Sequence, residues 1–254
     1  MKPIKLGEKN KIPEYPIGLI SAVPLEGTII LRHLKKIYKN VPRGLTIYKG
    51  NIQDKAVFYI ITGIGKTNAS AGTTLLIEKF SPYLIINFGV GGAYPSSSLK
   101  IGDIAVAEKE IYGDEGVYLK DGFHKTETID IPLLVKNRKK YFNEFQLDKN
   151  LMKKVVSISY APRIMVKSGP FLTLSTCTGT SKRVKELEKT FHAICENMEG
   201  AAVAHICTLY GIPMVEIRGI SNVVEDRDKK KWNIKLASKN CQKVVIEFLG
   251  NYNF

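Results

Sequence analysis

The sequence predicts an α/β fold in which a mainly parallel sheet is covered by helices on both faces. Two observations carry this prediction. Short apolar runs with the length of buried strands alternate with helical patterns along the chain. Glycine-rich turns follow several of these runs, at the strand ends where sheets of this class bind their ligands. The length of 254 residues suits one large α/β domain or at most two small ones.

The predicted elements follow from apolar periodicity and from turn signals. Strands are expected at 17–23, 57–62, 83–88, 104–107, 164–166, 171–174 and 213–220. Helices are expected at 26–37, 66–80, 181–189, 200–210 and 234–249. Pro82 lies just past the second helix, and Gly211 stops the fourth. Residues 112–161 carry many charges and weak periodicity, so we expect an excursion from the sheet and not a second domain.

Composition places the chain among ordinary globular proteins, with 44% hydrophobic and 24% charged residues. We expect residues 1–16 to form an N-terminal extension and residues 17–254 a single domain. No segment approaches the roughly 20 apolar residues that cross a bilayer, which predicts a cytoplasmic protein that binds no membrane. The 4 cysteines lack metal-site spacing and indicate a reducing compartment. We therefore expect neither a metal nor another cofactor.

The formal net charge of +14 suggests an anionic partner, either nucleic acid, lipid or an acidic small molecule. The densest basic clusters, 136–140 and 229–231, are short, and the remaining lysines are scattered. Such runs are usually solvated surface, so we expect no nucleic acid partner.

The glycine-rich turn at 63–65 resembles two nucleotide-binding motifs and fits neither. A P-loop requires a further glycine at position 60, which is Ile60, and a dinucleotide fingerprint requires one at position 68, which is Asn68. We therefore expect a tight turn between a strand and a helix.

Polar residues gather at the predicted strand ends. Glu26 follows the first strand, Glu199 opens a helix of small residues, and Arg218 and Asn222 end a buried strand. A lone glutamate at a helix start can simply favour the helix dipole. Two carboxylates, an arginine and an amide at one sheet edge suit glycosidic chemistry instead, in which one acid activates water and another holds the sugar hydroxyls.

The order of these motifs resembles the nucleoside phosphorylase and nucleosidase superfamily from residue 17 to residue 249, and within it the futalosine hydrolase family. The likeness rests on Thr-Cys-Thr-Gly-Thr at 176–180, Asn-Met-Glu-Gly-Ala-Ala at 197–202, and segments 18–26, 62–66, 87–92, 102–103, 168–171, 218–222 and 224–228 with Trp232. The resemblance implies a three-layer α/β/α fold, a homo-oligomer and a small-molecule nucleoside substrate.

The resemblance also implies roles for individual residues. Glu26 matches the glutamate that deprotonates the attacking water, Arg218 an arginine near that water, and Asn222 the residue beside the departing purine. Substrate contacts fall on Glu199 at the ribose hydroxyls, Met198 along the sugar, Phe171 at the base, and on Asn197, Val90 and Gly91. Met198 and Phe171 can equally be plain core residues.

Two departures from related enzymes indicate the reaction and the base. Phosphorylases bring an arginine and a serine to the phosphate, where this chain has Glu26 and Val90, so water fits and a phosphate dianion does not. Adenine-binding nucleosidases of the methylthioadenosine type have an aspartate at the position of Asn222. An asparagine amide donates to a 6-oxo oxygen and suits hypoxanthine.

These departures predict a hydrolase that splits futalosine into hypoxanthine and dehypoxanthine futalosine in menaquinone biosynthesis. Three alternatives remain open: a methylthioadenosine/S-adenosylhomocysteine nucleosidase, a purine nucleoside phosphorylase, and a basic nucleotide-binding module without catalysis.

Overall fold

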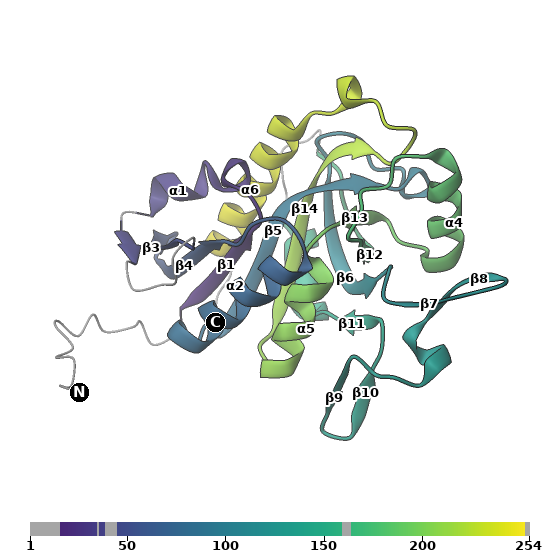
Figure 1. Ribbon diagram of the computed structural model, residues 1–254. Helices are drawn as coiled ribbons and strands as arrows, with labels where there is room; N and C mark the ends of the chain where they lie inside the picture. The colour runs from purple at the N-terminus through teal and green to yellow at the C-terminus, as the bar shows by residue number, and fades with distance from the viewer. Residues whose placement is uncertain (1–15, 35, 39–44, 159–163, 252–254) are drawn as a thin grey trace.

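A mixed sheet runs through the molecule and carries helices on both faces (Figure 1). The computed structural model describes residues 16–34, 36–38, 45–158 and 164–251. The predicted N-terminal extension therefore lies outside the described residues, apart from Pro16. The α/β class and the helical layers predicted from the sequence are confirmed.

The centre of the sheet is parallel. Its strands lie side by side in the order β4 (Lys55–Ile61), β1 (Ile17–Ser21), β5 (Leu84–Ala93) and β14 (Met214–Val223). Antiparallel strands β3 (Ile47–Ile52) and β2 (Lys36–Tyr38) extend the β4 side.

On the other side the strands close on themselves. β14 pairs with β6 (Ile104–Tyr112), β6 with β12 (Val166–Thr173), β12 with β13 (Cys195–Asn197), and β13 with β5. The two sequence runs predicted as separate strands at 164–166 and 171–174 belong largely to one strand, β12, which has a register shift between Gly169 and Pro170. The ring holds β5, β13 and β14 at fixed positions around one strand end.

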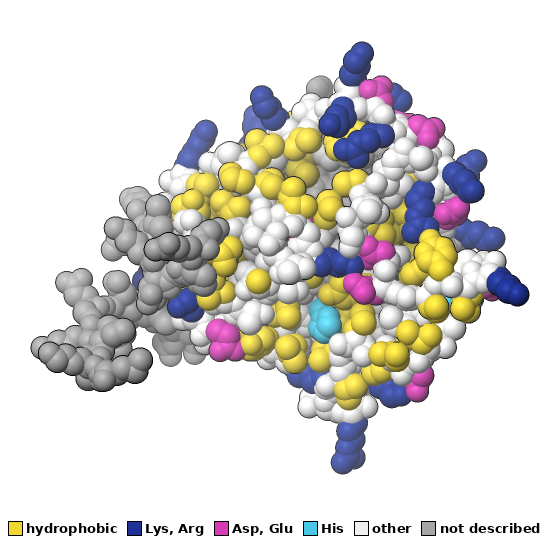
Figure 2. Space-filling view, in the orientation of Figure 1, with side chains coloured by type: hydrophobic (Ala, Val, Ile, Leu, Met, Phe, Trp, Pro, Cys, Tyr) yellow, Lys and Arg dark blue, Asp and Glu magenta, His cyan; other side chains and the backbone are white. Residues whose placement is uncertain are grey.

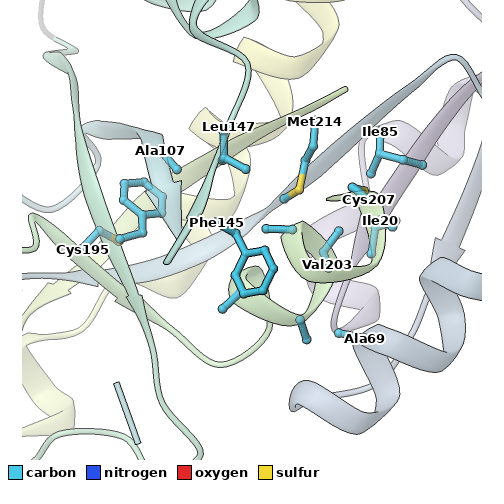
Figure 3. Packing of buried hydrophobic residues seen from close by; sticks show 14 of the residues in the cluster. Ile20, Ala69, Ile85, Ala107, Phe145, Leu147, Cys195, Val203, Cys207 and Met214 are labelled. Carbon is cyan, nitrogen blue, oxygen red and sulfur yellow. The ribbon is translucent and has the colours of Figure 1, made fainter. Parts of the chain in front are cut away.

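Two layers of helices cover the sheet. α2 (Lys66–Phe80) and α5 (Gly200–Tyr210) pack on one face, and α6 (Ile234–Asn251) with α3 (Lys149–Ser157) on the other. The strand residues alternate between the two faces, as the pleat requires: Ile20 belongs to the first core and Leu19 to the second. Figure 3 shows Ala69 of α2 and Val203 of α5 in the first of these cores.

The predicted helix at 26–37 is wrong. The structure has a short 3-10 turn, Pro24–Gly27, and one turn of α1 (Ile30–His33). Two side chains bond to the backbone here: the Glu26 carboxylate turns back onto the N–H groups of Ala22 and Val23, and Gln242 of α6, distant in the sequence, accepts from the N–H groups of Ile29 and Ile30. These contacts accompany short turns in place of one long helix.

The segment 89–92, predicted as a turn, is part of β5, because β14 and β13 pair with it on its two sides. The excursion at 112–161 is confirmed in part. It holds two hairpins off the main sheet, β7 (Gly116–Leu119) with β8 (Gly122–Lys125) and β9 (Leu134–Lys136) with β10 (Lys139–Tyr141). It then returns to the sheet through β11 (Glu144–Gln146), ahead of α3.

The remaining elements are α4 (Ser181–Phe191) and the 3-10 turns Pro95–Ser97, Thr126–Ile129 and Lys229–Lys231. Within the part of the chain that the structure describes, no helix combines the length and apolar character needed to cross a bilayer.

Candidate active site

A cavity opens where the parallel strands β1, β5 and β14 end. Its described lining is Ala22, Val23, Glu26, Ile64, Val90, Gly91, Gly92, Thr176, Cys177, Thr178, Glu196, Asn197, Met198, Glu199, Ser221, Asn222 and Trp232. These residues come from widely separated segments, which meet because carboxyl ends of parallel strands share one edge of a sheet. The structure thus brings together most of the residues that the sequence predicts for the site.

Glu26 is held by backbone amides. Its Oε1 accepts from the N–H of Val90 at 2.8 Å, and its Oε2 from Ala22 at 2.9 Å and Val23 at 3.1 Å. Burial raises the pKa of the Glu26 carboxyl, while Arg218 and the backbone amides oppose that rise. A buried carboxylate at the cavity wall with a raised pKa is suited to accept a proton from a reactant.

Glu199 begins α5, yet its side chain does not cap that helix. Asn197 does so, because its Oδ1 accepts from the N–H groups of Glu199 and Gly200 at 2.9 and 2.6 Å. The Glu199 carboxylate is thereby free to face the cavity. There Oε1 accepts from the Gly65 N–H at 3.0 Å, and Oε2 lies 3.7 Å from Nη1 of Arg218. The Glu199 side chain therefore serves the cavity and makes no hydrogen bond to the start of the helix.

Arg218 does not line the cavity. It is 1% exposed and lies behind the two cavity glutamates, with Nε 2.8 Å from Oε1 of Glu216. Burial by itself would lower the pKa of Arg218, but the carboxylates of Glu216, Glu199 and Glu26 outweigh burial and raise it. The guanidinium is therefore a permanent positive charge that positions the carboxylates from below.

A second carboxyl, Glu110, lies against Glu216 beneath α5. Both are fully buried, and a Cβ on Gly200 would collide with the two carboxyl groups, so position 200 has to be glycine. Burial, and then the charge of Glu216, raise the pKa of Glu110 well above the ordinary value. A protonated Glu110 can donate to Glu216, whose Oε2 is buried without another partner. The pair then carries one negative charge, which Arg218 balances.

Asn222 lies at the far end of β14, after a register shift between Ile220 and Asn222. Its Oδ1 lies 2.8 Å from the Ser221 hydroxyl, whose single hydrogen also has the carbonyl of Gly91 within reach at 3.1 Å, and its Nδ2 donates to the carbonyl of Val223 at 3.2 Å. One amide hydrogen of Nδ2 and a lone pair of Oδ1 remain for a ligand.

The other residues predicted to contact the substrate fall into two groups. Val90, Gly91 and Met198 line the cavity, whereas the Asn197 side chain is occupied with capping α5 and with Glu110. Phe171 is absent from the described lining: it is fully buried in the core between the sheet and α5. The pattern of the chain could not show which face of β12 it occupies.

Three contributors were missed as site residues. The loop at 176–178 lines the cavity, as do Trp232 and the carboxylate Glu196, which lies one residue before the predicted Asn197. Among the described residues, no cluster of three or more His, Cys, Asp or Glu side chains is arranged to hold a metal ion.

The profile of the phosphorylase superfamily matches residues 16–250. A 5'-methylthioadenosine/S-adenosylhomocysteine nucleosidase of Halalkalibacterium halodurans is 28% identical over 237 residues, which are 92% of this chain and 97% of the relative. The enzyme of the same name from Staphylococcus aureus strain MRSA252 is 29% identical over 208 residues, 82% of this chain and 86% of the relative.

Solved structures share the fold. The 5'-methylthioadenosine/S-adenosylhomocysteine nucleosidase of Neisseria meningitidis, in complex with methylthio-immucillin-A, superposes with a TM-score of 0.80 at 22% identity, covering 93% of this chain and 99% of that one. Futalosine hydrolase of Helicobacter pylori strain 26695 superposes with a TM-score of 0.78 at 22% identity, covering 94% and 98%.

The protonated state of Glu110 predicts a pH-dependent stability. Above the ordinary glutamate pKa of about 4.3, the unfolded chain releases this proton and the folded chain keeps it, so stability falls by up to about 1.4 kcal/mol per pH unit until the folded pKa is passed. Glu110→Gln removes this loss. In urea unfolding, the free energy of unfolding of Glu110→Gln should rise relative to that of wild type from pH 5 to pH 8.

Glu216→Gln is the matched control, because it removes the charge that faces Arg218 and should destabilise the fold at both pH values, by about 3–5 kcal/mol. Equal destabilisation by the two variants, without a pH trend in Glu110→Gln, would contradict the assignment of the proton.

Proposed function

The chain belongs to the phosphorylase superfamily, and from this premise we propose that it hydrolyses the N-glycosidic bond of a purine nucleoside. The observation that carries hydrolysis is the Glu26 carboxylate at the cavity wall, together with the absence of any Lys or Arg from the described lining. A phosphate dianion would meet carboxylates there and find no cation, whereas a water molecule can be held and deprotonated.

In the proposed reaction Glu26 orients a water molecule toward the anomeric carbon and takes its proton. The glycosidic bond lengthens through an oxocarbenium-like state, whose positive charge the carboxylates of Glu26 and Glu199 stabilise. Glu199 also accepts hydrogen bonds from the ribose hydroxyls, and the amide of Asn222 donates to the departing base. Arg218 places a buried positive charge behind both glutamates and opposes the rise that burial causes in the pKa of Glu26.

The names of the curated relatives favour adenine nucleosides as the substrate class, with a methylthio or homocysteinyl group at the 5' position. Their level of identity and their coverage of both chains make this type of nucleosidase the better supported one. The apolar lining residues beside the sugar, Met198 and Ile64, are compatible with such a substituent.

A second substrate class, the 6-oxopurine nucleosides, is favoured by one observation of this site. Nδ2 of Asn222 keeps one hydrogen beyond its bond to the carbonyl of Val223, and a 6-oxopurine presents acceptors for that hydrogen at both N7 and O6. Futalosine is a nucleoside of this kind, and futalosine hydrolase is the name of one structural neighbour. With this substrate the enzyme would act in menaquinone biosynthesis.

The first prediction concerns the co-substrate. Since the described lining of the cavity holds no Lys or Arg, base release should proceed at an undiminished rate in phosphate-free buffer that contains a chelator. Chromatography of the products should show free base and free sugar, from adenosine, methylthioadenosine, inosine or futalosine. A strict requirement for phosphate, with a sugar phosphate as the product, would refute hydrolysis.

The second prediction concerns the general base. Glu26→Gln should lower kcat about 10²–10⁴-fold, the usual contribution of a general base. Because the glutamine amide also meets backbone N–H donors, the melting temperature and the affinity for free purine have to be measured alongside kcat. A variant that folds, binds purine and keeps most of its activity would assign water activation to another group.

The third prediction separates the two substrate classes. If the amide of Asn222 selects the base, wild type prefers a 6-oxopurine nucleoside over its 6-amino counterpart about 5- to 150-fold, since a mismatched buried group loses about 1–3 kcal/mol. Asn222→Asp should narrow or reverse the ratio of the two kcat/KM values, because a protonatable carboxyl can accept from an amino group. A wild-type preference for the amino compound would support the methylthioadenosine class.

A further inference from the structure

Glu196 and Asn222 lie on either side of one residue, Gly92. In the sheet, Gly92 of β5 is the register partner of Glu196 on β13 and also of Asn222 on β14. A Cβ at Gly92 would lie 2.8 Å from Cγ2 of Val224, 3.3 Å from Nδ2 of Asn222 and 3.5 Å from Cγ of Glu196. Gly92, Asn222 and Glu196 all line the cavity. An amide and a carboxylate therefore flank the same backbone position of the cavity wall.

The two side chains have opposite hydrogen-bonding character. The carboxylate of Glu196 meets donors, with Oε2 at 2.9 Å from the Tyr94 hydroxyl and Oε1 at 3.1 Å from the Thr178 N–H. Each carboxylate oxygen has a second lone pair, so Glu196 can still accept a hydrogen. Asn222 can still donate one, because its Nδ2 makes one hydrogen bond, to the carbonyl of Val223. The wall presents a donor and an acceptor about two strand spacings apart, roughly 9–10 Å between backbones.

This pattern is complementary to one edge of a 6-oxopurine. Such a base carries acceptors at N7 and O6 and a hydrogen on N1, whereas adenine carries an amino donor at position 6 and an acceptor at N1. Against adenine, the Glu196 carboxylate would face the N1 lone pair, whereas the Asn222 hydrogen would still find an acceptor at N7. Glu196 is thus the side chain that would disfavour the amino base.

We propose that Glu196 is a specificity-determining residue that accepts the N1–H of a 6-oxopurine base while Asn222 donates to its N7 and O6 edge. The assignment rests on the proposed nucleosidase function and names its base. Burial raises the pKa of Glu196, and the hydrogen bonds from Thr178 and Tyr94 oppose that rise in part.

The test is calorimetric titration of free bases, which needs no turnover. Wild type should bind hypoxanthine about 10–100-fold more tightly than 1-methylhypoxanthine, which lacks the N1 hydrogen, and more tightly than adenine. Glu196→Ala should weaken the binding of hypoxanthine about 10–100-fold and leave the binding of 1-methylhypoxanthine equal or tighter. The ratio of the two affinities should then approach one. Tyr94→Phe is the matched control: it removes a donor to Glu196 but keeps the acceptor, and the ratio should persist.

A purely supporting role for Glu196 would weaken both bases equally in Glu196→Ala, and that result overturns the proposal. So would unchanged hypoxanthine binding, or tighter binding of adenine by wild type. If Glu196→Ala does not fold, Glu196→Gln replaces it, with the expectation that its amide gains affinity for adenine. Base release from nucleosides, measured separately, distinguishes failure of the proposed function from failure of the Glu196 assignment. A protein that binds bases but cleaves no nucleoside refutes the function and not the assignment.

Discussion

The site depends on one buried guanidinium and the carboxylates packed around it. Arg218 contacts Glu216 directly, lies close to Glu199, and raises the acidity of Glu26 against the effect of burial. Charges buried at this depth are tolerated when they are paired, and the loss of one partner costs about 3–5 kcal/mol. The proton on Glu110 keeps the deepest part of this network near neutrality, so the negative charge that remains belongs to the carboxylates at the cavity.

Backbone amides provide the rest of the compensation. Three N–H groups hold Glu26, and the N–H of Gly65 holds Glu199. This arrangement is possible because Asn197, and not Glu199, satisfies the first donors of α5. Amide dipoles stabilise the carboxylates without placing a mobile cation in the cavity, which would otherwise attract a phosphate. Water is therefore the proposed nucleophile, because backbone amides, and not a cation in the cavity, compensate the charges of Glu26 and Glu199.

The sequence predicts most strands and helices, because apolar runs and stop signals such as Gly211 are local. It misses the short turns after β1, since the contact of Gln242 with the N–H groups of Ile29 and Ile30 spans more than 200 residues and has no local signal. Most of the predicted site residues meet, because strand ends at one sheet edge are a general feature of the fold. Which side of a strand faces the cavity decides that Phe171 is buried and that Glu196 lines the cavity. Short strands without a clear alternation of apolar and polar residues do not show this side in the sequence.

The net charge of +14 and the acidic cavity are separate features of the molecule. Lys and Arg side chains lie scattered over the face seen in Figure 2, whereas the described cavity lining holds Glu26, Glu196 and Glu199 and no basic residue. The surplus of lysines therefore gives no information about the reaction. The charge of the cavity does give such information. Fixed carboxylates stabilise the cationic sugar that forms as a glycosidic bond breaks, and they do not stabilise the neutral base. A wall of this sign is complementary to the transition state that hydrolysis requires and repels the anion that phosphorolysis would need.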